Sequence, residues 1–305
     1  VTRVGEVTSD GVDIHDADLV QNLGYDGTGV RIGVISDGVD HLAAAVQSGD
    51  RPAGVTVLQG FSGSGDEGTA MLEIVHDVAP GAELVFATAG ETQLTFVDAI
   101  HALAAAGCDV MVDDIGFFAE PEFEDGPIAQ AVDSANAAGI AYYAAAGNSA
   151  EEHYEAPFVP AGTSSWHAWD GGSDSTLAIV VPAFGELLGF MKWSDPFGRS
   201  GNDYDLYLST QPSFADEFLV DVGGDFQDGA GDPIEFIYYF NRTSTAQTLY
   251  VGANLFEGDP RFLSLFLFGV QQVEYQTQVG SIWGHPNARG CVAVAAIHAD
   301  EVGHD

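Results

Sequence analysis

The first half of the chain alternates short apolar runs with amphipathic segments. The apolar runs, rich in β-branched side chains, predict buried strands and cover residues 30–35, 54–58, 83–89, 109–113 and 140–146. The segments with helical periodicity lie between them, at residues 70–78, 92–106 and 128–138. Residues 1–28 are polar and show no strong period. This alternation predicts a mainly parallel sheet covered by helices on both faces, which is a three-layer αβα arrangement.

The pattern changes near residue 163. From there to about residue 278 no segment has a convincing helical period. Eight short strand-like runs follow one another, separated by Gly, Pro, Asp and Asn, at residues 176–181, 187–193, 204–208, 217–222, 234–240, 247–252, 262–268 and 271–276. Their spacing predicts an antiparallel β-sandwich. We therefore expect an α/β domain made of residues 1–162 and 279–305, with a β-sandwich inserted at residues 163–278.

Charge separates this chain from most globular proteins. It has 46 acidic and 8 basic residues, a net charge of −38, and a single lysine, Lys192. Such a surface repels nucleic acids and anionic membranes, and no stretch of 18 apolar residues predicts a membrane span. The apolar content of 46 % favours a folded chain over a disordered one. We interpret the charge as a hydrated surface suited to high salt, as in a halophilic protein.

The two cysteines and the N-terminus bear on the compartment. Cys108 and Cys291 directly precede the predicted strands 109–113 and 292–297, and if those strands flank a third one the two thiols are too far apart to form a disulfide. We therefore expect free, buried cysteines. The N-terminal residues lack a signal-peptide core, so the chain is either cytoplasmic or has lost a leader. We expect an extracellular protein from which a leader has been removed.

Three polar motifs occur in a fixed order along the first half. Asp37-Gly38 ends the first strand, Glu67-Gly-Thr-Ala opens a helix, and Gly147-Asn148-Ser149 follows the strand at 140–146. Each has an ordinary alternative: a turn aspartate, a glutamate favoured by the helix dipole, and a Gly-Asn turn. Together, over about residues 20–160 and 280–300, they make the chain resemble the subtilase superfamily of serine peptidases, the subtilisins and the sedolisins.

The resemblance implies a mixed catalytic site. Asp37 matches the aspartate of the subtilisin pattern, and Asn148 matches its oxyanion asparagine. Glu67 stands where subtilisins have histidine, and a glutamate base is what sedolisins use. The sedolisin partner aspartate would fall at Met71, so the chain follows neither pattern throughout. Two carboxylates that share a site raise the pKa of one of them, and such a glutamate can act as a general base.

Two further regions take roles from the resemblance. Asp113, Asp114 and Gly116 stand where subtilisins carry a Ser-Leu-Gly next to the substrate. One of the two aspartates is a candidate to join the carboxylate cluster, and a solvated strand end is an equal alternative. The nucleophile signature Gly-Thr-Ser-x-Ala-x-Pro is absent. Gly162-Thr-Ser164 lacks the Ala and Pro, and we interpret it as a linker. Because residues 284–286 and 292–297 resemble the segment before the nucleophile, we expect the serine to lie on a missing C-terminal part or on a second chain.

The predicted sandwich carries its own likeness. Residues 192–208 are similar to the core motif of the pre-peptidase C-terminal family of β-sandwiches. Its carboxylates at positions 195, 203 and 205 form a candidate calcium site, although chance clustering is expected in so acidic a chain, and we assign no metal site or cofactor. We expect structural or surface roles for three histidines, at positions 76, 101 and 285.

The sequence therefore predicts a serine endopeptidase of the subtilase type. It would hydrolyse peptide bonds of a protein or peptide substrate through an acyl-enzyme, and this chain alone would be inactive for lack of its nucleophile. The alternative is a catalytically inactive subtilase-like protein that binds peptide or polysaccharide.

Overall fold

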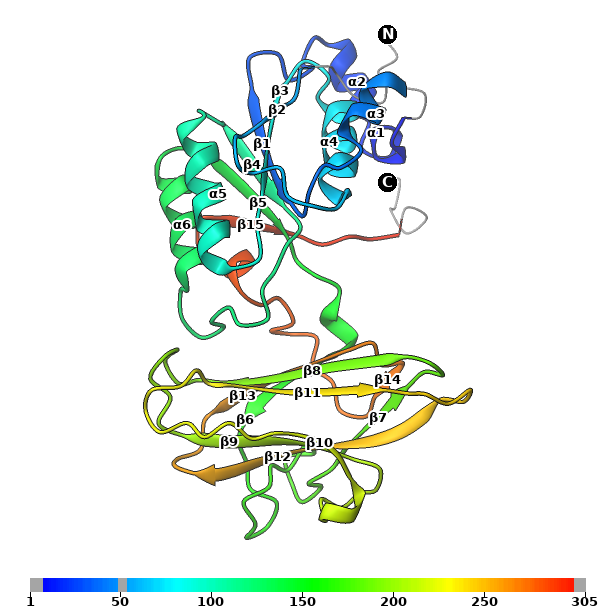
Figure 1. The fold of residues 1–305 in the computed structure, drawn as a ribbon, viewed down its shortest axis with the longest axis vertical. Coiled ribbons are helices and arrows are strands. Elements are labelled where there is room, and N and C mark those ends of the chain that lie inside the picture. Colours follow the sequence, from blue (N-terminus) through cyan, green and yellow to red (C-terminus); the bar gives the residue numbers. More distant parts are fainter. Residues whose placement is uncertain (1–7, 49–53, 299–305) are drawn as a thin grey trace. The chain divides into compact units, whose positions relative to one another are not determined.

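The structure is a computed structural model that describes residues 8–48 and 54–298. The chain divides into two compact units (Figure 1). The first contains the described residues up to Glu120, then Asp125–Ala146, and the residues from Gly284 on. The second contains Pro121–Glu124 and Gly147–Trp283. Each unit has its own hydrophobic core, so each is described by itself.

The first unit is built on a six-stranded sheet with the order β15-β5-β4-β1-β3-β2, in which all paired strands are parallel. The strands are β1 (Arg31–Ser36), β2 (Thr56–Val57), β3 (Glu83–Thr88), β4 (Val110–Asp113), β5 (Ala141–Ala145) and β15 (Cys291–Val294). All six were predicted. The apolar side chains of β1 and β3 are buried on both faces of the sheet, which is why these strands appear as continuous apolar runs.

Helices cover both faces of this sheet, as Figure 1 shows. The three predicted helices are α4 (Glu67–Val78), α5 (Gln93–Ala105) and α6 (Pro127–Ala137). Buried side chains of α5 and α6, such as Phe96 and Val132, form one core with the sheet. Leu72 of α4 packs with Val34 and Phe86 in the core on the other face. The three-layer αβα prediction is confirmed.

Three short helices were not predicted: α1 (Asp10–Ile14), α2 (Ala17–Asn22) and α3 (Leu42–Ser48). In the first two, burial is limited to single positions, Val12 and Ala17, so the sequence has little apolar period to reveal them. None of the helices within 8–48 and 54–298 is long and apolar enough to cross a membrane.

The second unit is an antiparallel sandwich of two sheets, with the orders β10-β9-β12-β7-β14 and β11-β8-β13-β6. Its strands are β6 (His153–Pro157), β7 (Leu177–Val181), β8 (Glu186–Trp193), β9 (Asp203–Ser209), β10 (Leu219–Gly223), β11 (Ile234–Phe240), β12 (Gln247–Glu257), β13 (Phe262–Phe268) and β14 (Gln272–Val273). The eight predicted strands are all present. Single 3-10 turns complete the chain at η1 (Ser149–Glu151), η2 (Asp216–Phe218) and η3 (His285–Asn287).

The boundaries of the sandwich differ from the expected 163–278. It begins at Gly147 because β6, which was not predicted, pairs with β13 at the edge of the four-stranded sheet. It ends at Trp283, whose ring packs edge-on against Phe190 of β8, with the ring centroids 5.8 Å apart. The β6 sequence is short, mostly polar and ends in Pro157, which hides its strand character.

The cysteines lie at the starts of two strands of the first unit's sheet. Cys108 lies two residues before β4 and Cys291 opens β15, and β5 lies between those two strands. Both thiols are free, with Cys108 buried and Cys291 half-buried. The expectation of free, buried cysteines agrees with the structure at Cys108, whereas Cys291 is only half-buried.

Candidate active site

Asp37 directly follows β1, at the carboxyl edge of the parallel sheet. Its Oδ1 accepts hydrogen bonds from the backbone N–H of Gly38 at 2.5 Å and of Gly68 at 3.3 Å. Its backbone carbonyl accepts a hydrogen bond from Thr88 Oγ1 at 2.7 Å. The side chain is half-buried and held from several sides. Ligands of open α/β sheets bind at this edge, so the position suits a group that takes part in chemistry.

Two glycines of the Gly65-Asp-Glu-Gly68 motif make room for this carboxylate. Gly65 has φ +115°, and a Cβ there would overlap Asp37 Oδ2. A Cβ at Gly68 would overlap the ring of Phe86 and crowd the carbonyl of Gly38. The glycines therefore allow the start of α4 to approach the end of β1. This close approach explains why glycine occupies both ends of the Gly65-Asp-Glu-Gly68 motif.

Glu67 is the first residue of α4, and its Oε2 accepts a hydrogen bond from Ser36 Oγ at 3.3 Å. The pKa of Glu67 is raised above its usual value, first by burial and then by the negative charges of Asp114 and Asp37, while the Ser36 hydrogen bond opposes the rise. Although the residue is exposed overall, these neighbours make ionisation of its carboxyl group more costly.

Asp114 joins this group because of the register between two neighbouring strands. Ile35 of β1 pairs with Asp113 of β4, so Asp114 is carried beside the end of β1. The structure thus brings three carboxylates together at one edge of the sheet, those of Asp37, Glu67 and Asp114. A carboxylate whose pKa is raised is a stronger base than usual, so it can take the proton of a hydroxyl group as that group reacts.

Asp113 lies on the opposite face, because successive side chains of a strand alternate. Its Oδ1 contacts His285 Nε2 at 3.1 Å, and the other ring nitrogen, Nδ1, lies 3.0 Å from Glu120 Oε2. All three side chains are 3 % exposed or less. In this structure Asp113 is a partner of His285, and neither of its carboxylate oxygens faces solvent for the predicted contact with substrate.

The charge of His285 follows from its two neighbours. Burial by itself lowers the pKa of an imidazole, but the carboxylates of Asp113 and Glu120 outweigh it and raise the pKa of His285 to about 10. The Phe96 ring packs edge-on against the imidazole, with the ring centroids 5.1 Å apart. The expected structural role of His285 agrees with this position. Nothing in the sequence predicted its partners, which lie more than 160 residues away.

The remaining predicted site residues have simpler surroundings. Gly116 is exposed in the loop after β4. Asn148 is exposed at the start of η1, and it belongs to the second unit, so its role as an oxyanion donor stays a prediction. Ser164 also lies in the second unit, where its Oγ donates to the carbonyl of Ala161 at 2.8 Å within a turn. Ser36, the hydroxyl partner of Glu67, is fully buried.

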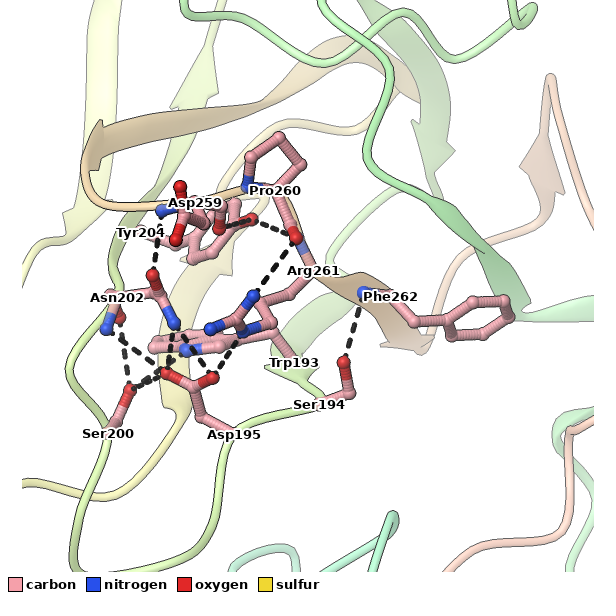
Figure 2. Close-up of polar contacts among 10 residues, drawn as sticks. All are labelled: Trp193, Ser194, Asp195, Ser200, Asn202, Tyr204, Asp259, Pro260, Arg261 and Phe262. Carbon is pink, nitrogen blue, oxygen red and sulfur yellow. Dashed lines mark hydrogen bonds and ion pairs between the residues drawn. The ribbon is translucent and has the colours of Figure 1, made fainter.

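The candidate calcium site is not formed. Asp195 Oδ1 accepts a hydrogen bond from Arg261 Nε at 2.6 Å, and its Oδ2 accepts one from Ser200 Oγ at 3.0 Å (Figure 2). Asn202 donates to the same carboxylate from its side chain and its backbone. The guanidinium group of Arg261 thus supplies the positive charge that a calcium ion would otherwise supply. Within the described parts of the chain, no three His, Cys, Asp or Glu residues are arranged to hold a metal ion.

Comparison with known proteins rests on structure. Neither a family model nor a curated protein sequence matches this chain. The CspB protease of Clostridium perfringens matches with a TM-score of 0.52 and 10 % identity, over 94 % of this chain and 74 % of that one. A lanthipeptide protease matches 46 % of this chain at 16 % identity (TM-score 0.36), and the self-cleaved protease domain of PatA matches 41 % at 19 % identity (TM-score 0.31).

These matches concern the fold. The chain spans about half the length of the last two structures, 45 % and 52 %. The match to the CspB protease extends over nearly the whole chain, sandwich included. The fold is therefore similar to that of subtilase-family proteases with an inserted domain.

Proposed function

We propose that this chain is part of a serine endopeptidase of the subtilase type, which hydrolyses peptide bonds through an acyl-enzyme. The observation that carries the proposal is the meeting of the Asp37 and Glu67 carboxylates at the carboxyl edge of the sheet, in a fold similar to that of subtilase-family proteases. A protein or peptide is the corresponding substrate. An extracellular location and a salty environment belong to the same proposal.

Glu67 is the general base in this proposal. Its ionised form takes the proton of an incoming serine hydroxyl, and the negative charges of Asp37 and Asp114 make that proton easier to hold. Asp37 is itself fixed by the N–H groups of Gly38 and Gly68, so it can keep the start of α4 in place during the reaction. Asn148 is proposed as the oxyanion donor.

The nucleophile comes from outside the described residues in this proposal, either from a C-terminal segment or from a second chain. Ser36, whose Oγ donates to Glu67, is enclosed by the sheet and cannot meet a substrate. The 305-residue chain alone is therefore expected to be inactive. Casein turnover by this chain, together with fluorophosphonate labelling of one of its serines, would contradict the proposal.

The test of the enzyme uses the protein purified from its source, with its intact mass determined. It should cleave casein in salt, and a fluorophosphonate should label one serine and stop the cleavage. In the recombinant full-length protein, Glu67→Gln should lower kcat/KM by about 10²–10⁴-fold, as expected for loss of a general base. Glu91→Gln, which changes an exposed glutamate outside the site, is the matched control and should leave kcat/KM unchanged.

An inactive binding protein is the second candidate. It is favoured by one observation: among the described residues, the hydroxyl that is hydrogen-bonded to Glu67 is the buried Ser36. This candidate predicts that the source protein binds peptides or polysaccharide measurably by calorimetry, without any cleavage or fluorophosphonate labelling.

A further inference from the structure

The single lysine of the chain is completely buried. Lys192 lies on β8, between Met191 and Trp193, whose side chains point into the sandwich core. Lys192 therefore projects from the opposite face of the four-stranded sheet. Its Nζ lies 4.8 Å from the centre of the Phe190 ring and 5.1 Å from that of Trp283. An amine in such a site is largely shielded from water, which penalises its charged form.

A carboxyl group lies directly beside this amine. Glu122 Oε2 is 3.8 Å from Lys192 Nζ, and the two side chains are 6 % and 0 % exposed. Glu122 belongs to Pro121–Glu124, the short segment that is part of the second unit. Burial raises the pKa of Glu122 above its usual value, and the positive charge of Lys192 opposes the rise. Transfer of one proton from the ammonium to the carboxylate produces a neutral amine next to a neutral acid.

A second carboxyl group is available on the same sheet face. Ser264 of β13 pairs with Lys192 of β8 on one side and with Glu155 of β6 on the other. The Glu155 charge acts on Glu122 and contributes to its raised pKa. Glu155 is itself half-buried, and the position of Ser264 lies between it and Lys192 across the sheet.

We propose that Lys192 and Glu122 condense into an intramolecular amide bond, which makes this pair a self-modification site. The amine nitrogen attacks the carboxyl carbon of protonated Glu122, and a C–N bond forms. The surplus proton on nitrogen passes to the leaving hydroxyl, the C–O bond breaks, and one water departs. The reaction needs no oxidant, cofactor or activated donor.

The surroundings favour this reaction over a lasting ion pair. A buried ion pair loses hydration that its mutual attraction repays only with good geometry, and 3.8 Å is longer than a hydrogen bond. The amide is neutral, so it removes this cost. It also ties two segments far apart in the sequence at the place where the chain enters the sandwich unit.

Intact mass of the purified full chain tests the proposal. The protein should be one water, about 18 Da, lighter than its sequence. A protease specific for lysine should fail to cut the denatured chain, because Lys192 is its single target. Peptide mapping should recover residues around 122 and 192 as one branched peptide. A mass equal to the sequence, with cleavage after Lys192, would overturn the proposal.

Variants separate this bond from other losses of water. Glu122→Ala should restore the full mass and the cleavage at Lys192, whereas Glu124→Ala, the exposed neighbouring carboxylate, should keep the cross-link. Glu155→Gln removes a negative charge that raises the pKa of Glu122, so it should slow formation of the bond. Succinimides at Asp-Gly sites such as Asp37-Gly38 also lose water, but hydroxylamine opens them and leaves the amide intact. A loss of water that persists in Glu122→Ala counts against the proposal.

Discussion

Two groups of carboxylates lie on opposite sides of the end of β4. They differ in whether a positively charged side chain neutralises (compensates) their negative charge. On one side, Asp113 and Glu120 enclose His285, and the three side chains are buried. On the other side, Asp114, Glu67 and Asp37 meet, and the hydrogen bond to Glu67 comes from a neutral serine. The compensated group holds the fold together. Within residues 8–48 and 54–298, no ion pair neutralises the carboxylates of Asp37, Glu67 and Asp114. Holding like charges together costs stability and suits a group that must exchange a proton.

The second unit repeats the compensated arrangement. Asp195 is paired with Arg261 and is also bound by Ser200 and Asn202. Burial raises the pKa of Asp195, but the hydrogen bonds from Arg261 and Asn202 outweigh it and lower the pKa below its usual value. In contrast, the pKa of Glu67 is raised. The neighbouring groups therefore decide whether the pKa of a carboxyl group in this chain rises or falls.

Salt should have the largest effect, because it acts on the uncompensated surface charge of −38. The Debye length falls from about 30 Å at 0.01 M to about 3 Å at 1 M salt, so repulsion across the molecule is screened. The melting temperature should rise steeply over this range. Potassium and sodium at equal strength should act alike if screening is the cause. A flat profile from about 0.05 to 2 M salt would show that the acidic surface is not a salt adaptation.

Replacement of His285 should have the next largest effect on the stability of the protein. His285→Gln leaves two buried carboxylates without their cation, which should cost about 3–5 kcal/mol of the free energy of unfolding. Urea unfolding measures this cost, and His101→Gln, at an exposed position, is the control that should change little. A loss below about 1 kcal/mol would mean that the network is not a compensated one.

The same network predicts a pH dependence. The pKa of His285 is raised to about 10 in the folded state, above the usual 6.5. The contribution of His285 to the free energy of unfolding is therefore fully present below pH 6.5 and is lost as the pH rises through about 10. Wild-type stability should fall over this window, and His285→Gln should lack that part of the fall.

Asp195→Ala should have a moderate effect, since it leaves Arg261 without its partner and removes the acceptor for Ser200 and Asn202. We expect a loss of about 2–3 kcal/mol in urea unfolding. Because the folded pKa of Asp195 is lowered, its stabilisation is present above the usual pKa of 3.8 and is lost as the pH falls through the lowered value. An equal loss at neutral pH and well below about pH 3 would contradict this explanation.

Glu67→Gln should have the smallest effect on stability, and of opposite sign. The raised folded pKa of Glu67 means that its ionisation destabilises the protein as the pH rises through that pKa. Glutamine resembles the neutral acid, so the variant should melt slightly higher than the wild type at neutral pH and equally at acid pH. A lower melting temperature at neutral pH would show that Glu67 is a structural residue.

The sequence by itself determined most of the strands, the three longer helices and the candidate residues Asp37 and Glu67. Apolar periodicity marked the six strands of the first sheet and eight strands of the sandwich, because burial is recorded locally in residue type. The resemblance placed Asp37 and Glu67 in one site, and the structure shows that Gly65 and Gly68 allow their close approach. The register between β1 and β4 then added Asp114.

Tertiary structure alone decided which distant residues meet. His285 reaches Asp113 and Glu120 because the chain returns from the sandwich next to β5, and no local pattern records that return. β6 escaped prediction because it gains its strand partners from β13, more than 100 residues later. The enclosure of Lys192 and Glu122 is also decided by tertiary structure. The rings of Phe190 and Trp283 lie next to the Lys192 ammonium group, and both side chains are shielded from water.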